Sequence, residues 1–143
     1  DVYKRQDHSF TFAHFPVSMA AALATIQVIE QEHLIERAQR LGAQATARLR
    51  EMQEKYELIG DVRGPGLMIG VELVKDRKTK EPAREEAHEF VSEGLKRGVI
   101  FGESKYNRLG NVVKFKPPLV TTEAQLSLAL DVFEEIVKKL DGE

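Results

Sequence analysis

The sequence contains no cysteine and no tryptophan, and only five of its 143 residues are proline. Without cysteine the chain forms no disulfide, binds no metal through thiolates and carries no thiol nucleophile. Its apolar runs fall short of the roughly 20 residues that a membrane-spanning helix needs, and no secretory signal is visible. These absences predict a cytoplasmic protein, and the length suits a single domain with an apolar core.

An excess of one charge sign is also missing. The 21 basic and 23 acidic side chains give a net charge of −2, which argues against a nucleic-acid or anionic-membrane surface. The histidines do not share a helical face at ligand spacing, so no metal site is predicted. The chain also lacks a Gly-x-Ser-x-Gly elbow, a Walker-type loop and a dinucleotide-binding fingerprint.

Residues 1–6, Asp-Val-Tyr-Lys-Arg-Gln, show no periodicity and precede a strongly patterned sequence that begins at Asp7. This hexapeptide is similar to the translation of a transposon-type sequencing adapter. We interpret it as a non-native head and exclude it from the fold prediction. On this interpretation the chain is a fragment of a longer protein.

Two helices are predicted in the first third of the chain. Pro16 favours a helix start, and the Ala-rich, apolar segment up to Gln31 predicts a helix that is buried on most sides. Beyond His33, apolar residues recur at helical spacing up to about Lys55 with charged residues between them. This pattern predicts a second, amphipathic helix whose charges form a solvated face.

A small sheet is predicted in the middle of the chain. Alternating or continuous apolar residues bounded by turn residues predict four short strands, at 58–62, 67–74, 99–101 and 111–115. The charged segment 76–81 is predicted to be a solvated hairpin or crossover tip. Gly70 weakens the second strand unless another group packs closely against it.

Two more helices complete the prediction. The third should begin at Pro82 and end at Gly98, which suits a left-handed cap, and should bury Ala87, Val91 and Leu95. The last begins with a capping-box pattern at Thr122 and Gln125. Its apolar stripe is continuous and comprises Leu126, Ala129, Leu130, Phe133, Ile136, Val137 and Leu140. Long N-terminal helices, a small central sheet and a C-terminal amphipathic helix make an α+β fold.

The segment Ile59-Gly-Asp-Val-Arg-Gly-Pro-Gly-Leu-Met-Ile-Gly-Val-Glu-Leu-Val74 crowds three glycines and a proline around one turn. By itself it indicates only a tight turn with unusual dihedral angles. Phe10-Thr-Phe-Ala-His-Phe-Pro16 precedes it along the chain, and Val74-Lys-Asp-Arg-Lys-Thr-Lys-Glu-Pro82 and Pro117-Pro-Leu119 follow it. Together, in this order, these segments resemble the class-III aminotransferases, which are fold-type-I enzymes that use pyridoxal 5'-phosphate (PLP).

The resemblance implies a division of the chain and an activity. Residues 7–55 would hold a cofactor-phosphate loop and inter-domain helices, and residues 56–143 would be the C-terminal small domain. The full-length enzyme would transfer an amino group between an amino acid or amine and a 2-oxo acid, as a homodimer or higher oligomer. Its Schiff-base lysine and its pyridinium-binding aspartate would lie upstream of Asp7. The chain would therefore contain no catalytic residue and be inactive alone.

Thr11 is the candidate cofactor-binding residue. In the family, the matching threonine hydrogen-bonds the PLP phosphate of the neighbouring subunit. A hydroxyl group and backbone N–H groups near a helix start suit such a dianion. From its position alone, Thr11 is better explained as an ordinary turn or cap residue, and the resemblance reverses this preference.

Lys114 is the candidate substrate-binding residue. Many members of the family carry an arginine at this place, ahead of Pro117-Pro-Leu119, that binds the substrate α-carboxylate. A lysine ammonium could also bind a carboxylate, with less directional geometry than an arginine fork. The alternative is a lysine on the exposed face of a short strand. Arg63 is interpreted as structural, paired with a nearby carboxylate such as Asp61.

Other functions stay open at this point. Decarboxylases, racemases and lyases of the same family use the same small domain. From a different class, a free-standing α+β interaction or ligand module would share this topology without any enzymatic activity. The predicted partners are a small-molecule amino donor and a 2-oxo acid, with no nucleic acid and no membrane.

Overall fold

The computed structural model describes residues 15–104 and 110–142. The chain divides into two compact units, Asp1–Ile35 and Glu36–Glu143. Thr11 and the predicted head at 1–6 lie outside the described residues. Among the helices that the model does describe, none combines the length and the hydropathy needed to cross a membrane.

The first unit contributes one described helix, α1 (Pro16–Gln31), with Pro16 in its first turn as predicted. None of the residues of α1 is buried, and Val17 and Leu23 are more than 60% exposed. The expected burial on most sides is therefore wrong for this chain by itself. The described part of the unit contains no second element that could cover so apolar a helix, so its side chains face solvent.

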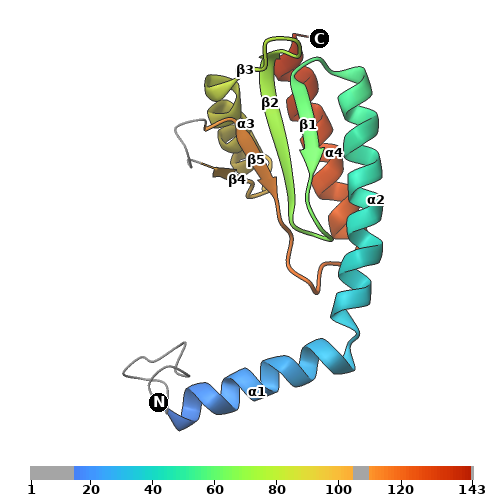
Figure 1. Ribbon diagram of the computed structural model, residues 1–143, viewed down its shortest axis with the longest axis vertical. Helices are drawn as coiled ribbons and strands as arrows, with labels where there is room; N and C mark the ends of the chain where they lie inside the picture. Colours follow the sequence, from blue (N-terminus) through green and yellow to red (C-terminus); the bar gives the residue numbers. More distant parts are fainter. Residues whose placement is uncertain (1–14, 105–109, 143) are drawn as a thin grey trace, which may run out of the picture. The chain divides into compact units, whose positions relative to one another are not determined.

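Of the elements in the described residues, the second unit contains every strand and the other three helices (Figure 1). It is an α+β fold, as predicted from the sequence. In chain order after α1 come α2 (Leu34–Lys55), β1 (Ile59–Arg63), β2 (Ile69–Asp76), β3 (Glu81–Pro82), α3 (Arg84–Lys96), β4 (Gly102–Ser104), β5 (Val112–Phe115) and α4 (Glu123–Asp141). The start of α2 overlaps the end of the first unit.

The sheet has the strand order β1-β2-β5-β4, and every neighbouring pair is antiparallel. The short β3 pairs with the end of β2 and forms the hairpin that the charged segment 76–81 predicts. The strand predicted at 99–101 is wrong, because β4 begins only at Gly102, just beyond the end of the predicted range. Val99 donates its backbone N–H to the Gly94 carbonyl at 2.9 Å. Its N–H is thus used to close the end of α3.

The three helices of this unit pack against one face of the sheet, and the core lies between the two layers (Figure 1). Ile69, Val71 and Leu73 of β2 face this core, and all three are at most 2% exposed. Four phenylalanine rings meet at its centre, with centroid distances between 4.6 and 6.3 Å; they are Phe90, Phe101, Phe115 and Phe133. Pairs of this kind add to the stabilisation from burial alone.

The buried face of α3 differs from the predicted one. Ala87, Phe90 and Gly94 are buried, whereas Val91 is partly exposed and Leu95 is 65% exposed. Gly94 explains the rotation of the buried face, because a Cβ atom there would lie 2.5 Å from Cδ2 of Phe101. Because Gly94 has no side chain, the ring of Phe101, the residue just before β4, fits against α3 at this point.

The glycine turn between β1 and β2 packs against α2. Gly64 and Gly66 both have positive φ angles, of 140° and 50°, which explains the glycines in the sequence. The Met68 N–H closes the turn on the Pro65 carbonyl at 3.0 Å. Gly66 lies directly over Gly42 in the middle of α2, where an added Cβ would collide with the Gly66 backbone. The close approach of the turn to the helix therefore requires a glycine at position 42.

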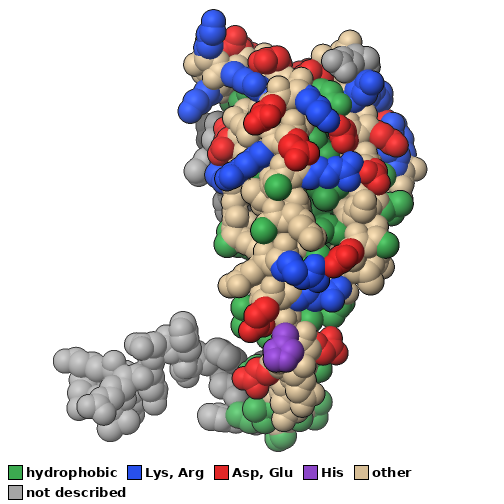
Figure 2. Space-filling model, turned by 90° about the vertical axis from the view of Figure 1, so that its right-hand side faces the viewer, with side chains coloured by type: hydrophobic (Ala, Val, Ile, Leu, Met, Phe, Trp, Pro, Cys, Tyr) green, Lys and Arg blue, Asp and Glu red, His purple; other side chains and the backbone are tan. Residues whose placement is uncertain are grey.

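Ion pairs join α2 to α4 along their length. Arg40 pairs with Glu123 at 2.6 Å, and Arg48 pairs with Asp131 at 2.6 Å. Because both partners advance by eight residues between these pairs, the two helices run in the same direction. On the face of this unit that Figure 2 shows, acidic and basic side chains are intermixed, with no large area of one sign. This agrees with the balanced composition.

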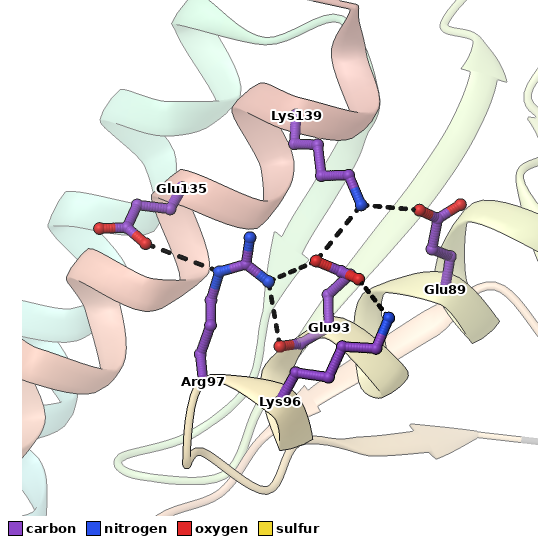
Figure 3. A network of polar contacts seen from close by, with 6 residues as sticks. All are labelled: Glu89, Glu93, Lys96, Arg97, Glu135 and Lys139. Atoms are coloured by element: carbon purple, nitrogen blue, oxygen red, sulfur yellow. Dashed lines mark hydrogen bonds and ion pairs between the residues drawn. The ribbon is translucent and has the colours of Figure 1, made fainter.

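A second polar network joins α3 to α4 (Figure 3). Its centre is Glu93, whose side chain is only 9% exposed. Its carboxylate contacts Lys96 at 2.8 Å, Lys139 at 3.3 Å and the guanidinium of Arg97. Hydrogen bonds from Lys96, Arg97 and Lys139 lower the pKa of Glu93 from 4.5 to about 2. Since this buried carboxylate has cationic partners on both helices, we regard the network as structural.

Candidate functional site

The candidate site lies on the sheet face that is turned away from the helices. Successive side chains of a strand point to opposite faces, and Val113 and Phe115 of β5 point into the core. Lys114 between them therefore points to the other face. We call this surface the open face, and its described members include Asp61, Arg63, Gly70, Glu72, Gly102 and Lys114.

The strand register gives Lys114 a glycine on each side. It lies opposite Gly70 on β2 and opposite Gly102 on β4. A Cβ atom added to Gly102 would lie 3.4, 3.5 and 3.9 Å from Cβ, Cδ and Cγ of Lys114, so the lysine stem extends over Gly102. Neither cross-strand neighbour has a side chain that could cover or pair with the ammonium group.

Lys114 and Arg63, on the same face, differ in their polar partners. In the described parts of the chain, the Lys114 ammonium has neither an ion pair nor a hydrogen bond. Nη1 of Arg63 contacts Oδ2 of Asp61 at 2.6 Å and Oε2 of Glu72 at 2.7 Å. These hydrogen bonds, which Arg63 donates to Asp61 and to Glu72, raise the pKa of Arg63, and the bond to Asp61 has the larger effect. The predicted structural pairing of Arg63 with Asp61 is therefore confirmed, and Glu72 is an additional partner.

The two predicted site residues cannot be placed together. Lys114 lies on the open face, while Thr11 lies outside the described residues. The sequence contains no local pattern that indicates the roles of Gly102 and Glu72, since both depend on which residues of neighbouring strands face each other. Gly70 is different, because a glycine inside an otherwise apolar strand indicates from the sequence alone that another group approaches closely.

A pocket of about 510 Å³ lies near the C-terminal end of β5, at Phe115. Its lining includes Phe101, Pro117, Pro118 and Leu128 and is mostly apolar. Phe101 and Phe115 belong to the core side of the sheet, so the pocket is not part of the open face. Within 15–104 and 110–142, no group of His, Asp and Glu residues could hold a metal ion.

Comparison with known proteins gives the class-III aminotransferase family over most of the chain. The family model described as "Aminotransferase class-III" matches residues 1–137. Because this range includes residues 1–6, their foreign origin stays a prediction. A leucine/methionine racemase of Thermococcus litoralis is 46% identical over 134 residues, which are 94% of this chain and 29% of that protein.

Other relatives carry different names. An (R)-1-hydroxy-2-aminoethylphosphonate ammonia-lyase of Vibrio splendidus is 43% identical, over 92% of this chain and 26% of its own length. Among solved structures, an aminotransferase of Bacillus anthracis superposes with a TM-score of 0.86 at 31% identity, over 93% of this chain and 30% of that one. The chain thus spans less than a third of the length of these proteins.

Proposed function

The chain belongs to the class-III aminotransferase family, and from this premise we propose that it is the C-terminal part of a PLP-dependent aminotransferase. The full-length enzyme would move an amino group between an amino acid or amine and a 2-oxo acid. Residues 7–55 would contain the cofactor-phosphate loop and the inter-domain helices, and residues 56–143 would be the small domain. The match to the class-III aminotransferase family and the similarity to a solved aminotransferase structure support this proposal.

One observation carries the role of this chain in the reaction. Lys114 presents a positive charge between two glycines on the open face, and no described group neutralises it. A substrate α-carboxylate could approach over this glycine floor and accept a hydrogen bond from the ammonium. Such a charge-assisted contact would hold and orient the substrate at its carboxylate end.

The cofactor itself would be held mainly outside the described residues. PLP would withdraw electrons from the α-carbon of the substrate, and it needs a Schiff-base lysine that we place upstream of Asp7. Thr11 would hydrogen-bond the cofactor phosphate of a neighbouring subunit, which would make the enzyme at least a homodimer. A cytoplasmic location stays a proposal from the sequence.

The test uses the full-length enzyme that carries this chain. Lys114→Ala should raise the amino-acid KM by about 10- to 100-fold, because one hydrogen bond to a charged group is lost. The matched control is Lys116→Ala, since Lys116 is an exposed lysine just beyond β5. An unchanged KM in Lys114→Ala, or an equal rise in both variants, would remove this role from Lys114.

Racemisation and elimination are the second candidate activities. They are favoured by the relatives named leucine/methionine racemase and ammonia-lyase, which are among the more similar proteins. A screen of amino acids and amines with the full-length protein and PLP separates the reactions. Amino transfer to a 2-oxo acid supports the leading proposal. Inversion at the α-carbon, release of ammonia or release of CO2 without amino transfer would replace it with racemase, lyase or decarboxylase activity.

A further inference from the structure

Glu72 is an acidic neighbour of Lys114 on the open face. Lys114 lies opposite Gly70, and Glu72 is two residues further along β2. In an antiparallel pair such diagonal neighbours have Cα atoms about 7–8 Å apart, which is within reach of long side chains. By register alone, a lysine and a glutamate in these positions could form an ion pair across the two strands.

The structure shows that Glu72 has another partner. Its Oε2 contacts Nη1 of Arg63 on β1 at 2.7 Å, and the same guanidinium nitrogen contacts Asp61. Glu72 thus pairs with a residue on the side of β2 that faces away from β5. Lys114 extends over Gly102, on the side of β5 that faces away from β2. The two side chains of the expected pair therefore lean in opposite directions.

We infer that Arg63 is a positioning residue that holds the Glu72 carboxylate away from Lys114 and so keeps the Lys114 ammonium available for a substrate carboxylate. This inference rests on the proposed role of Lys114. Arg63 itself would touch neither substrate nor cofactor. Without Arg63, Glu72 would be left without its cation and would turn towards Lys114. The tethered carboxylate would then compete with the carboxylate of the substrate.

Removing Arg63 should not unfold the protein. Its side chain is 52% exposed, and exposed ion pairs contribute little to stability. An effect of Arg63→Ala on binding can therefore be measured in a folded enzyme. Arg63→Ala could also weaken binding of a carboxylate for a second reason, because the loss of a positive charge weakens anion binding through the general field of the surface. The experiment must distinguish this effect from the positioning role. The chain offers a matched control for this, since Asp61 and Glu72 are both partners of Arg63.

The experiment measures the binding of pentanoate, an unreactive monocarboxylate, to the full-length enzyme by calorimetric titration. Arg63→Ala should raise the Kd by about two- to fivefold, which corresponds to one exposed ion pair. Arg63→Ala with Glu72→Gln should restore the original Kd. Arg63→Ala with Asp61→Asn has the same net charge but keeps Glu72, so it should bind as weakly as Arg63→Ala. Kinetics with the natural substrate should show the same order in KM, with kcat unchanged.

The outcomes separate this inference from the proposed function. An unchanged Kd in Arg63→Ala, or equal rescue by Asp61→Asn and Glu72→Gln, would overturn the positioning role while leaving Lys114 as the carboxylate site. If pentanoate binds Lys114→Ala as tightly as the unaltered enzyme, or does not bind the unaltered enzyme at all, the role of Lys114 fails, and the role of Arg63 fails with it. If Glu72→Gln restores the Kd of Arg63→Ala and Asp61→Asn does not, the roles of Lys114 and Arg63 are both supported.

Discussion

The two faces of the sheet use the same strands for different purposes. On the core face, Val71, Leu73, Val113 and Phe115 are all at most 2% exposed and pack against three helices. On the open face, Glu72 and Lys114, which lie between these residues, remain partly exposed. The core face is constrained by close packing. We propose that the unpaired lysine of the open face serves binding rather than folding.

The glycines of the two faces show the same difference. Gly42 in α2 faces the backbone of Gly66, and no side chain fits between them. Gly102 on the open face meets only the stem of Lys114, and an added Cβ there would be in ordinary contact with it. One glycine is needed for the fold, and the other gives space to a side chain. Substitutions at these sites can therefore test the comparison directly.

Gly42→Ala should have the largest effect. By helix propensity alone, alanine would stabilise α2 by roughly 1 kcal/mol. Because the new Cβ would collide with the Gly66 backbone, we expect instead that the free energy of unfolding falls by about 1–3 kcal/mol. Urea unfolding followed by circular dichroism measures it. Gly102→Ala is the control and should change stability by no more than about 0.5 kcal/mol. A stabilised Gly42→Ala protein would show that the turn does not pack on α2.

Most of the elements could be predicted because their signals are local. Pro16 at the start of α1, the capping box of Thr122 and Gln125, and the alternation of β2 all depend on residues close together in sequence. The position of β4 could not be predicted, because Val99 bonds back to α3. The role of Gly42 was also hidden, since it depends on a turn more than 20 residues further along the chain.

The site shows the same limit. Family resemblance drew attention to Lys114, and the sequence alone left it equally explained as an exposed strand residue. Its two glycine neighbours and the engagement of Glu72 by Arg63 appear only when the strands are paired in register. A shift of one residue would turn Lys114 into the core. The chemical meaning of the lysine thus depends on pairing that no local pattern determines.

The Glu93 network on the helix layer should give a smaller, pH-dependent effect (Figure 3). The cations Lys96, Arg97 and Lys139 hold the pKa of Glu93 at about 2, below its ordinary value of 4.5. Since the folded-state pKa is lowered, the stabilisation is complete above about pH 4.5 and is lost as the pH falls towards 2. Thermal unfolding between pH 7 and pH 2 measures it.

Glu93→Gln should lower stability at neutral pH and flatten this part of the pH profile. Glu89→Gln is the control, because Glu89 also pairs with Lys139 but its side chain is 51% exposed. It should leave the pH profile almost unchanged, since Glu93 keeps all of its cations. An equally steep acid profile in Glu93→Gln would assign the pH dependence to other carboxylates.

Lys114→Arg should have the smallest effect on folding and would sharpen the comparison from the open face. The residue lies between two glycines and is partly exposed, so stability should stay within about 0.5 kcal/mol of the original. A guanidinium can form two parallel hydrogen bonds with a carboxylate, so the amino-acid KM of the full-length enzyme should fall by about two- to fivefold. Lys114→Gln, which keeps a long polar side chain without charge, should raise it. If arginine raises KM as much as glutamine does, the site needs the compact ammonium rather than any cation. The space over Gly102 would then be matched to lysine, and the open face would select its substrate by shape as well as by charge.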